Sequence, residues 1–153
     1  MQRSAENSGP TAWSAQSNCL SPASQPRPQT TGTVFKSARV LVVEDNFIIL
    51  MELEATLREA GAKVVGSCLT LESALRLAQS GDINAALLDI RLGRETIAPV
   101  ARCLARRGIP FAFYTAQTEA DPSLAEWPEA VILQKPASPK AIVAALAGLL
   151  RPR

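Results

Sequence analysis

The chain has 153 residues, 47% of them hydrophobic and 20% charged, which is the composition of one ordinary globular domain. The net charge of +2 arises within residues 1–36, so residues 37–153 carry no bulk charge that would attract nucleic acid or anionic lipid. The absence of histidine excludes a phosphohistidine donor role, and it removes the commonest metal ligand and general base.

The sequence also bears on the compartment of the protein. Its first residues lack the apolar core of a secretory signal, and the longest apolar run, residues 141–150, is about half of a ~20-residue membrane span. Cys19, Cys68 and Cys103 form no Cys-x-x-Cys pair, which favours reduced thiols. We therefore expect a soluble cytoplasmic protein with no direct contact to membranes or nucleic acid.

Residues 1–36 differ in composition from the rest of the chain. They are rich in Ser, Thr and Gln and contain Pro10, Pro22, Pro26 and Pro28. Such a segment buries too little apolar surface to offset the entropy lost on ordering. We predict a disordered tail over residues 1–36 that folding does not need, and a folded domain over residues 37–153.

The first predicted elements are two strands and the helix between them. The continuous apolar run at residues 40–43 predicts a strand buried on both faces of a sheet. Residues 50–57 carry leucines at helical spacing, and Gly61 ends that predicted helix. Two valines at residues 64–65 indicate a second strand.

The middle of the chain continues the alternation. Residues 71–78 predict a second helix, with Thr70 as its N-cap and Gly81 as its stop. The apolar residues 85–88 predict a third strand. A third helix is expected over residues 97–107, because a glycine follows it.

The last third contains one irregular region. Residues 111–114 and 131–133 predict the fourth and fifth strands. Between them, residues 115–129 hold two prolines and few apolar side chains, so a fourth helix is predicted to be short, distorted or absent. The final helix is predicted over residues 138–150, with Ser138 as its cap and a proline in its first turn.

Strands that alternate with helices indicate right-handed crossovers and a parallel sheet covered on both faces. Five strands in about 115 residues fit an α/β fold of the flavodoxin-like (βα)5 type. This fold is a doubly wound parallel sheet with the strand order 2-1-3-4-5.

Chemically distinctive residues follow four of the five predicted strands. They are Glu44 and Asp45 after the first strand, Asp89 after the third, Thr115 after the fourth and Lys135 near the end of the fifth. The carboxyl ends of parallel strands share one edge, so these side chains should converge. Clustered carboxylates repel one another unless a cation lies between them, and an all-oxygen site suits Mg²⁺. A carboxylate here could form an aspartyl phosphate, with an ammonium and a hydroxyl contacting the phosphoryl oxygens.

Each residue alone has a simpler interpretation. Asp45 could cap the helix that begins near Asn46. Asp89 could be an ordinary loop residue, Thr115 could make a local turn hydrogen bond, and Lys135 could be solvated. The conjunction of these residue types at four strand ends favours a shared site.

The same residues carry a family resemblance. The segments at residues 42–46, 87–89, 114–116 and 134–136, which read VVEDN, LLD, YTA and QKP, are similar to the signature of response-regulator receiver domains. The resemblance covers about residues 38–150. As a set these motifs are highly specific, whereas the Lys-Pro pair alone would carry no information.

The resemblance implies a role for each acidic residue. Asp89 is implied to be the phosphoacceptor and a metal ligand. Asp45 is implied to bind Mg²⁺ directly, Glu44 to act mainly through metal-bound water, and the backbone carbonyl of Arg91 to complete the protein ligands. A histidine kinase or a histidine phosphotransfer protein is the implied phosphodonor.

The resemblance also implies that Thr115 and Lys135 contact the phosphoryl group, and that the Lys135-Pro136 bond is cis. Thr115 and the residue at position 132 would form the switch. Receivers usually have an aromatic residue at the latter position, whereas this chain has Ile132. The run at residues 90–95, IRLGRE, also departs from the Met-Pro and Asp-Gly pairs of most receivers.

In its weak fourth helix the chain is similar to an alphaproteobacterial subgroup of single-domain receivers, which carry a Phe-x-Thr-Gly-x-Tyr motif. Phe113 and Thr115 match this motif, whereas Ala116 and Thr118 do not.

The leading hypothesis is a phosphoryl-accepting module of a two-component phosphorelay, which acts through protein contacts and catalyses only its own phosphorylation and dephosphorylation. The alternative is an interaction module of the same fold that works without phosphorylation. A phosphohydrolase of the haloacid dehalogenase type needs an acid two residues after the nucleophile, where this chain has Arg91. Nucleotide-binding glycine motifs are absent from the sequence.

The last helix is more apolar than one buried stripe requires. Residues 142, 145, 146 and 149 should face the sheet, which leaves a second row of Val143, Ala147 and Leu150. We predict that this row forms a partner or homodimer surface. Packing of Val143 and Leu150 under the loop before the fifth strand is the alternative.

Overall fold

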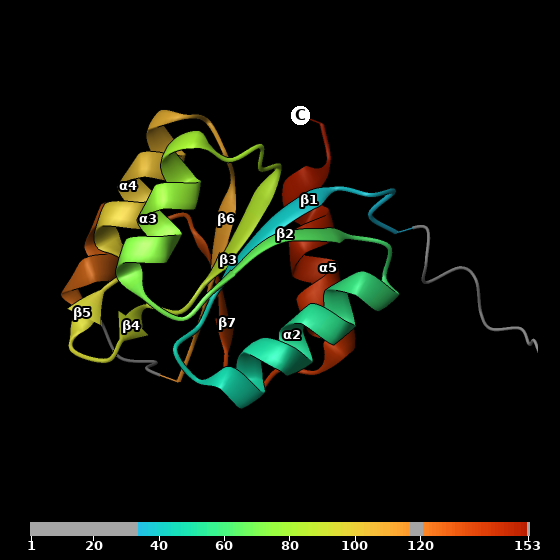
Figure 1. Cartoon of the computed structure of the whole chain (residues 1–153), viewed down its shortest axis with the longest axis horizontal. Coiled ribbons are helices and arrows are strands. Elements are labelled where there is room, and N and C mark those ends of the chain that lie inside the picture. The colour runs from blue at the N-terminus through green and yellow to red at the C-terminus, as the bar shows by residue number, and fades with distance from the viewer. Residues whose placement is uncertain (1–33, 117–120, 153) are drawn as a thin grey trace, which may run out of the picture. The chain divides into compact units, whose positions relative to one another are not determined.

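The computed structural model describes residues 34–116 and 121–152 (Figure 1). Most of the predicted disordered tail, residues 1–36, lies outside these ranges. Among the described helices, none combines the length and the apolar character that a membrane span requires.

In the described residues five parallel strands form one sheet, in the order β2-β1-β3-β6-β7. The strands are β1 (Arg39–Val43), β2 (Lys63–Cys68), β3 (Ala85–Leu88), β6 (Phe111–Thr115) and β7 (Val131–Gln134). Counted along the sheet-forming strands alone, this is the order 2-1-3-4-5. The predicted doubly wound, flavodoxin-like α/β fold is therefore confirmed.

The α-helices of the described residues cover both faces of this sheet (Figure 1). They are α2 (Phe47–Glu59), α3 (Leu71–Ser80), α4 (Ala98–Arg106) and α5 (Pro139–Leu150). α3 and α4 lie together on one face, and α2 and α5 lie on the other (Figure 1). Because successive strand side chains point to opposite faces, Leu41 and Val43 enter one core cluster, whereas Val40 and Val42 enter the other.

Local signals in the sequence set the helix ends. The predicted caps Thr70 and Ser138 each accept a hydrogen bond from the backbone N–H three residues later. Gly61 and Gly108 follow α2 and α4 with φ angles of 95° and 71°. Only glycine adopts this left-handed conformation without steric cost, so each of the two helices ends where the sequence indicated.

Two short elements interrupt the alternation. Directly after β3, the antiparallel pair β4 (Arg91–Leu92) and β5 (Glu95–Thr96) forms a hairpin that the sequence did not predict. Gly93 turns this hairpin with a φ angle of 63°. In the region of the doubtful fourth helix, the described residues form the 3-10 helix η4 (Pro122–Glu126), which agrees with the prediction of a short or distorted element.

The packed part of the chain begins before residue 37. Phe35 is only 4% exposed and belongs to the core cluster under α2 and α5. Its backbone N–H also donates to the carbonyl of Ala60 at 3.2 Å. The boundary predicted at residue 36 thus cuts off a core side chain, because a single aromatic residue at the end of a polar segment produces no recognisable pattern.

Of the four α5 residues predicted to face the sheet, Ile142 and Leu146 are buried, whereas Ala145 and Leu149 are half-buried. The second row of Val143, Ala147 and Leu150 is half-buried and packs against the same core cluster. Val143 and Ala147 line a groove of about 490 Å³ between α5 and α2. Part of this row therefore already packs within the chain, and the groove leaves the rest of it open on the side of α2.

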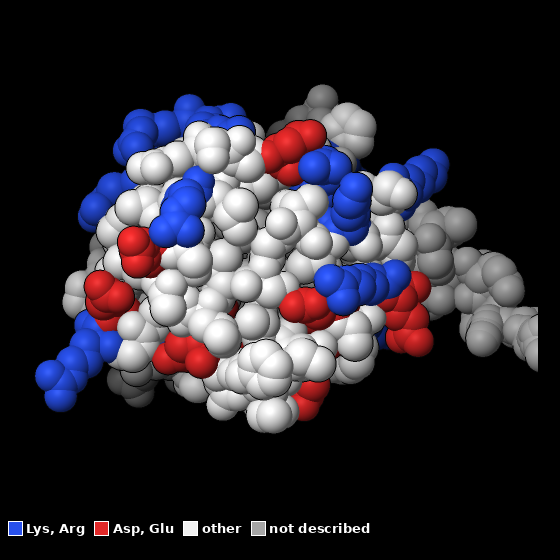
Figure 2. Space-filling view, viewed as in Figure 1, with Lys and Arg blue, Asp and Glu red and all other residues white. Residues whose placement is uncertain are grey.

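Acidic and basic side chains are interspersed over the face drawn in Figure 2, with Lys and Arg residues gathered near one end of α3 and α4. Arg107, which follows α4, has a structural role. Its guanidinium donates to the carbonyls of Ala78 and Gly81 at 2.6 and 2.8 Å. A cation at these carbonyls stabilises the C-terminal end of α3.

Candidate functional site

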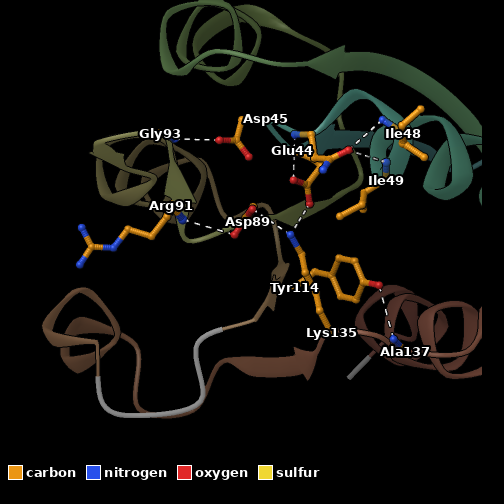
Figure 3. Close-up of polar contacts among 11 residues, drawn as sticks. Glu44, Asp45, Ile48, Ile49, Asp89, Arg91, Gly93, Tyr114, Lys135 and Ala137 are labelled. Carbon is orange, nitrogen blue, oxygen red and sulfur yellow. Dashed lines mark hydrogen bonds and ion pairs between the residues drawn. The ribbon is translucent and has the colours of Figure 1, made fainter.

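Most of the predicted site residues follow the carboxyl ends of neighbouring strands, and the side chains of Glu44, Asp89 and Lys135 meet at one edge of the sheet (Figure 3). Glu44 and Asp45 follow β1, and Asp89 follows β3. Thr115 is the last residue of β6, and Lys135 comes directly after β7. The parallel order of the sheet thus brings together residues that lie up to 91 positions apart.

Lys135 connects two of the three acidic side chains. Its Nζ donates to Oε2 of Glu44 at 2.5 Å and to Oδ2 of Asp89 at 2.9 Å. Glu44 is 1% and Asp89 7% exposed, so both carboxylates are largely removed from water. Because an unpaired buried charge is costly, this ammonium group stabilises the two acids at close range.

Burial and pairing act in opposite directions on these groups. Burial raises the pKa of Glu44 above its ordinary value, and the hydrogen bond from Lys135 offsets this effect only in part. Burial alone would lower the pKa of Lys135, but its hydrogen bonds to Glu44 and Asp89 outweigh burial and raise it. Lys135 therefore carries its positive charge at every physiological pH.

Asp45 does not cap the adjacent helix. Asn46 does so, because its side-chain oxygen accepts from the N–H groups of Ile48 and Ile49 at 2.9 and 3.2 Å. Asp45 is exposed, and its Oδ2 accepts from the backbone N–H of Gly93 at 2.8 Å. One carboxylate oxygen of Asp45 thus remains directed at the acidic cluster (Figure 3).

The three carboxylates match the chemistry of a divalent cation site. Glu44, Asp45 and Asp89 each place one oxygen so that the three atoms lie within 4.8 Å of one another. Hard oxygen donors of this kind are those that Mg²⁺ prefers. The N–H of Arg91 donates to Oδ1 of Asp89 at 3.3 Å, so the backbone of the residue expected to contribute a carbonyl ligand begins next to Asp89.

Thr115 and Ile132 differ sharply in their surroundings. Thr115 is 1% exposed, and its backbone carbonyl accepts from the N–H of Lys135 at 2.8 Å. Ile132 is 48% exposed on β7, which is an edge strand of the sheet. The Lys135-Pro136 bond is cis, as the resemblance implied.

Two residues of the site region were not anticipated. Tyr114 has its ring 5.3 Å from Nζ of Lys135, and its hydroxyl accepts from the N–H of Ala137 at 3.4 Å. Asp121 pairs with Arg91, whose Nε lies 3.0 Å from its Oδ2. The sequence marks Asp121 only as the start of an Asp-Pro turn, since a partner 30 positions away leaves no local pattern.

Comparison with known proteins shows which proteins the chain resembles. Residues 40–147 match the family model described as the response regulator receiver domain. Two curated relatives, both transcriptional regulatory protein PdtaR of Mycobacterium tuberculosis, are 28% identical over 95 residues, which is 61% of this chain and 46% of theirs. The chain thus spans about half the length of the curated relatives it matches.

Solved structures show the same fold. The response regulator receiver protein from Sinorhizobium medicae is 25% identical with a TM-score of 0.65, over 76% of this chain and 96% of that one. The response regulator PhyR from Brucella abortus is 29% identical with a TM-score of 0.63, over 74% and 48% of the two chains. A CheY-like receiver domain from Methanospirillum hungatei reaches a TM-score of 0.67 at 20% identity, over 74% and 93%, and shares the fold alone.

Proposed function

The chain belongs to the response regulator receiver domain family of two-component systems, and on this premise we propose that it accepts a phosphoryl group on Asp89 with the help of Mg²⁺. The observation that carries the proposal is the position of Lys135. Its ammonium group lies between the buried carboxylates of Glu44 and Asp89, within hydrogen-bond distance of both.

Receiver domains interact with histidine kinases or histidine phosphotransfer proteins, and we propose one of these as the donor. A carboxylate oxygen of Asp89 attacks the phosphorus of the donor's phosphoimidazole. The new P–O bond forms as the P–N bond breaks, and the electron pair of that bond returns to the imidazole nitrogen. The product is an acyl phosphate on Asp89.

The chain's own residues support this transfer in distinct ways. Lys135 stays protonated and lies 2.9 Å from Oδ2 of Asp89, so it can neutralise charge on a phosphoryl group attached there. The hydroxyl of Thr115 is proposed as a second contact to that group. Asp45, Asp89 and the carbonyl of Arg91 would hold Mg²⁺, with Glu44 acting through water, and the cation would supply further charge neutralisation.

The proposed chemistry is confined to Asp89 itself. The chain would catalyse only its own phosphorylation and dephosphorylation and would turn over no other substrate. Free Cys68 and Cys103 thiols support a cytoplasmic location as part of the same proposal. The signal would leave through a protein contact.

Incubation of the protein with acetyl phosphate and Mg²⁺, followed by intact-mass measurement, tests the acceptor. Wild-type protein should gain one phosphoryl group, and Asp89→Asn should gain none. Equal phosphorylation of the two proteins would show that Asp89 is not the acceptor. Failure of the wild type to bind Mg²⁺ and a beryllofluoride mimic would favour the alternative, an interaction module that works without phosphorylation.

A homodimer through α5 remains a prediction. The second apolar row of α5, which consists of Val143, Ala147 and Leu150, is half-buried, so the surface available for association is smaller than the sequence suggested. Val143→Glu also places a charge beside the core, whereas Ala144→Glu alters an exposed position on the same helix. Loss of phosphorylation-dependent association in a folded Ala144→Glu variant, measured by light scattering, would support the dimer. Unchanged association would place the dimer contact elsewhere.

A further inference from the structure

The segment at residues 90–93, which follows Asp89 and includes β4, is here called the acceptor loop. Its backbone contacts two of the three acidic residues. The N–H of Arg91 donates to Oδ1 of Asp89, and the N–H of Gly93 donates to Oδ2 of Asp45. The carbonyl of Arg91 belongs to the same loop. Any displacement of this loop therefore alters the metal ligand set itself.

The side chain of Arg91 points away from the acidic cluster (Figure 3) and reaches η4. Its Nε lies 3.0 Å from Oδ2 of Asp121, whose side chain is only 1% exposed. The other oxygen of Asp121 accepts from the N–H of Ser123 at 2.8 Å. Such a buried carboxylate strongly favours the charged partner that it already has.

Asp121 can act as an anchor because η4 is itself fixed to the body of the domain. The Trp127 ring packs against Phe111 and Phe113, with ring centroids 5.9 and 5.8 Å apart. A second ion pair joins Arg102 of α4 to Glu126 at the end of η4, with both nitrogen–oxygen contacts at 2.9 Å or shorter. η4 is thus attached to β6 and α4 independently of the acceptor loop.

We propose that Asp121 is a positioning residue of the phosphoacceptor site, which holds Arg91 and thereby fixes the backbone carbonyl of Arg91 for the divalent cation. This inference rests on the proposed function of Asp89 and its Mg²⁺ site. In this proposal η4 presents one buried carboxylate to the acceptor loop, a role that does not require a regular α-helix.

A purely structural role for Asp121, as the N-cap of η4, makes a different prediction. Asp121→Asn keeps an amide oxygen that can accept from Ser123, so the cap survives, whereas the charge that holds Arg91 is lost. Glu126→Gln is the matched control, because it removes only an exposed ion pair at the other end of η4, while the packing of Trp127 still fixes η4 and the Arg91–Asp121 contact stays in place.

The experiment is a calorimetric titration of the full chain with Mg²⁺, well below the unfolding temperature. Loss of a contact to a metal ligand typically weakens metal affinity at least tenfold, so we expect about tenfold weaker binding in Asp121→Asn. Glu126→Gln should bind like wild type. Wild-type affinity in Asp121→Asn, or equal weakening in Glu126→Gln, would overturn the proposal.

The double variant Arg91→Met with Asp121→Asn guards against misfolding, because it leaves no unpaired buried charge. We expect it to bind Mg²⁺ no more weakly than Asp121→Asn alone, since both substitutions break one contact. Additive losses would overturn the proposal. If wild type itself binds no Mg²⁺, the proposed function fails with it, whereas normal wild-type binding with an unaffected Asp121→Asn variant defeats only the positioning role.

Discussion

Glu44 and Lys135 lie 91 residues apart in the sequence, yet their side chains form a hydrogen bond of 2.5 Å at the carboxyl edge of the sheet. Glu44 is almost fully buried, and Lys135 is the cation that compensates its charge. The ion pair offsets the repulsion within the acidic cluster. Removal of Lys135 should therefore lower the free energy of unfolding as well as impair phosphorylation.

Lys135→Met should therefore lower the free energy of unfolding by about 3 kcal/mol in EDTA, because it leaves buried carboxylates unpaired. Mg²⁺ should restore more stability to this variant than to wild type, since the cation takes over the lost positive charge. Urea denaturation with and without Mg²⁺ measures both effects, and Lys140→Met at an exposed position is the control. A variant as stable as wild type in EDTA would contradict the role given to Lys135.

Asp45→Ala should abolish Mg²⁺-dependent phosphorylation and leave the fold intact. Removing one of three clustered carboxylates relieves repulsion, so the free energy of unfolding should stay within about 0.5 kcal/mol of wild type or rise. Mg²⁺ titration in a Trp13→Phe background, followed by Trp127 fluorescence, measures the binding. Glu52→Ala, an exposed acid on α2, should bind normally, and undiminished affinity in Asp45→Ala would remove Asp45 from the ligand set.

Phe35→Ala should destabilise the domain by about 3 kcal/mol, because it empties a buried position in the core cluster. Phe47→Ala is the matched control, since that ring is 57% exposed, and its effect should stay within about 0.5 kcal/mol. Thermal unfolding of the full chain compares the three proteins. Similar small effects of both substitutions would mean that the folded domain begins after residue 36.

Cys68 should react slowly with thiol reagents in the native protein. It is 3% exposed, and burial raises the pKa of its thiol above the ordinary value of 9.0. Fewer thiolates form at a given pH, so the labelling rate of a Cys19→Ser, Cys103→Ser variant should reach half of its maximum above pH 9.0, the pH at which an ordinary thiol is half-ionised. Rapid labelling at neutral pH, as fast as in denaturant, would be incompatible with this environment.

The sequence predicted the sheet and helices because each of them carries a local periodic signal with a cap or a glycine at its ends. The convergence of Asp89 and Lys135 was also predictable, since parallel strands end at a common edge. The β4–β5 hairpin was not, because two-residue strands are too short to alternate. The Arg91–Asp121 pair was missed for another reason: it joins two irregular segments, whose meeting depends on tertiary packing alone.

The sheet separates the hydrophobic interior into two compartments that share no residue. Leu57 and Leu146 lie in one of them, and Val100 and Leu104 lie in the other. Substitutions in different compartments should therefore change stability additively, whereas two substitutions within one compartment should couple. Residues on one side of the sheet can accordingly change in evolution independently of residues on the other side. Residues at the strand ends, where both compartments adjoin the acidic cluster, lack that independence.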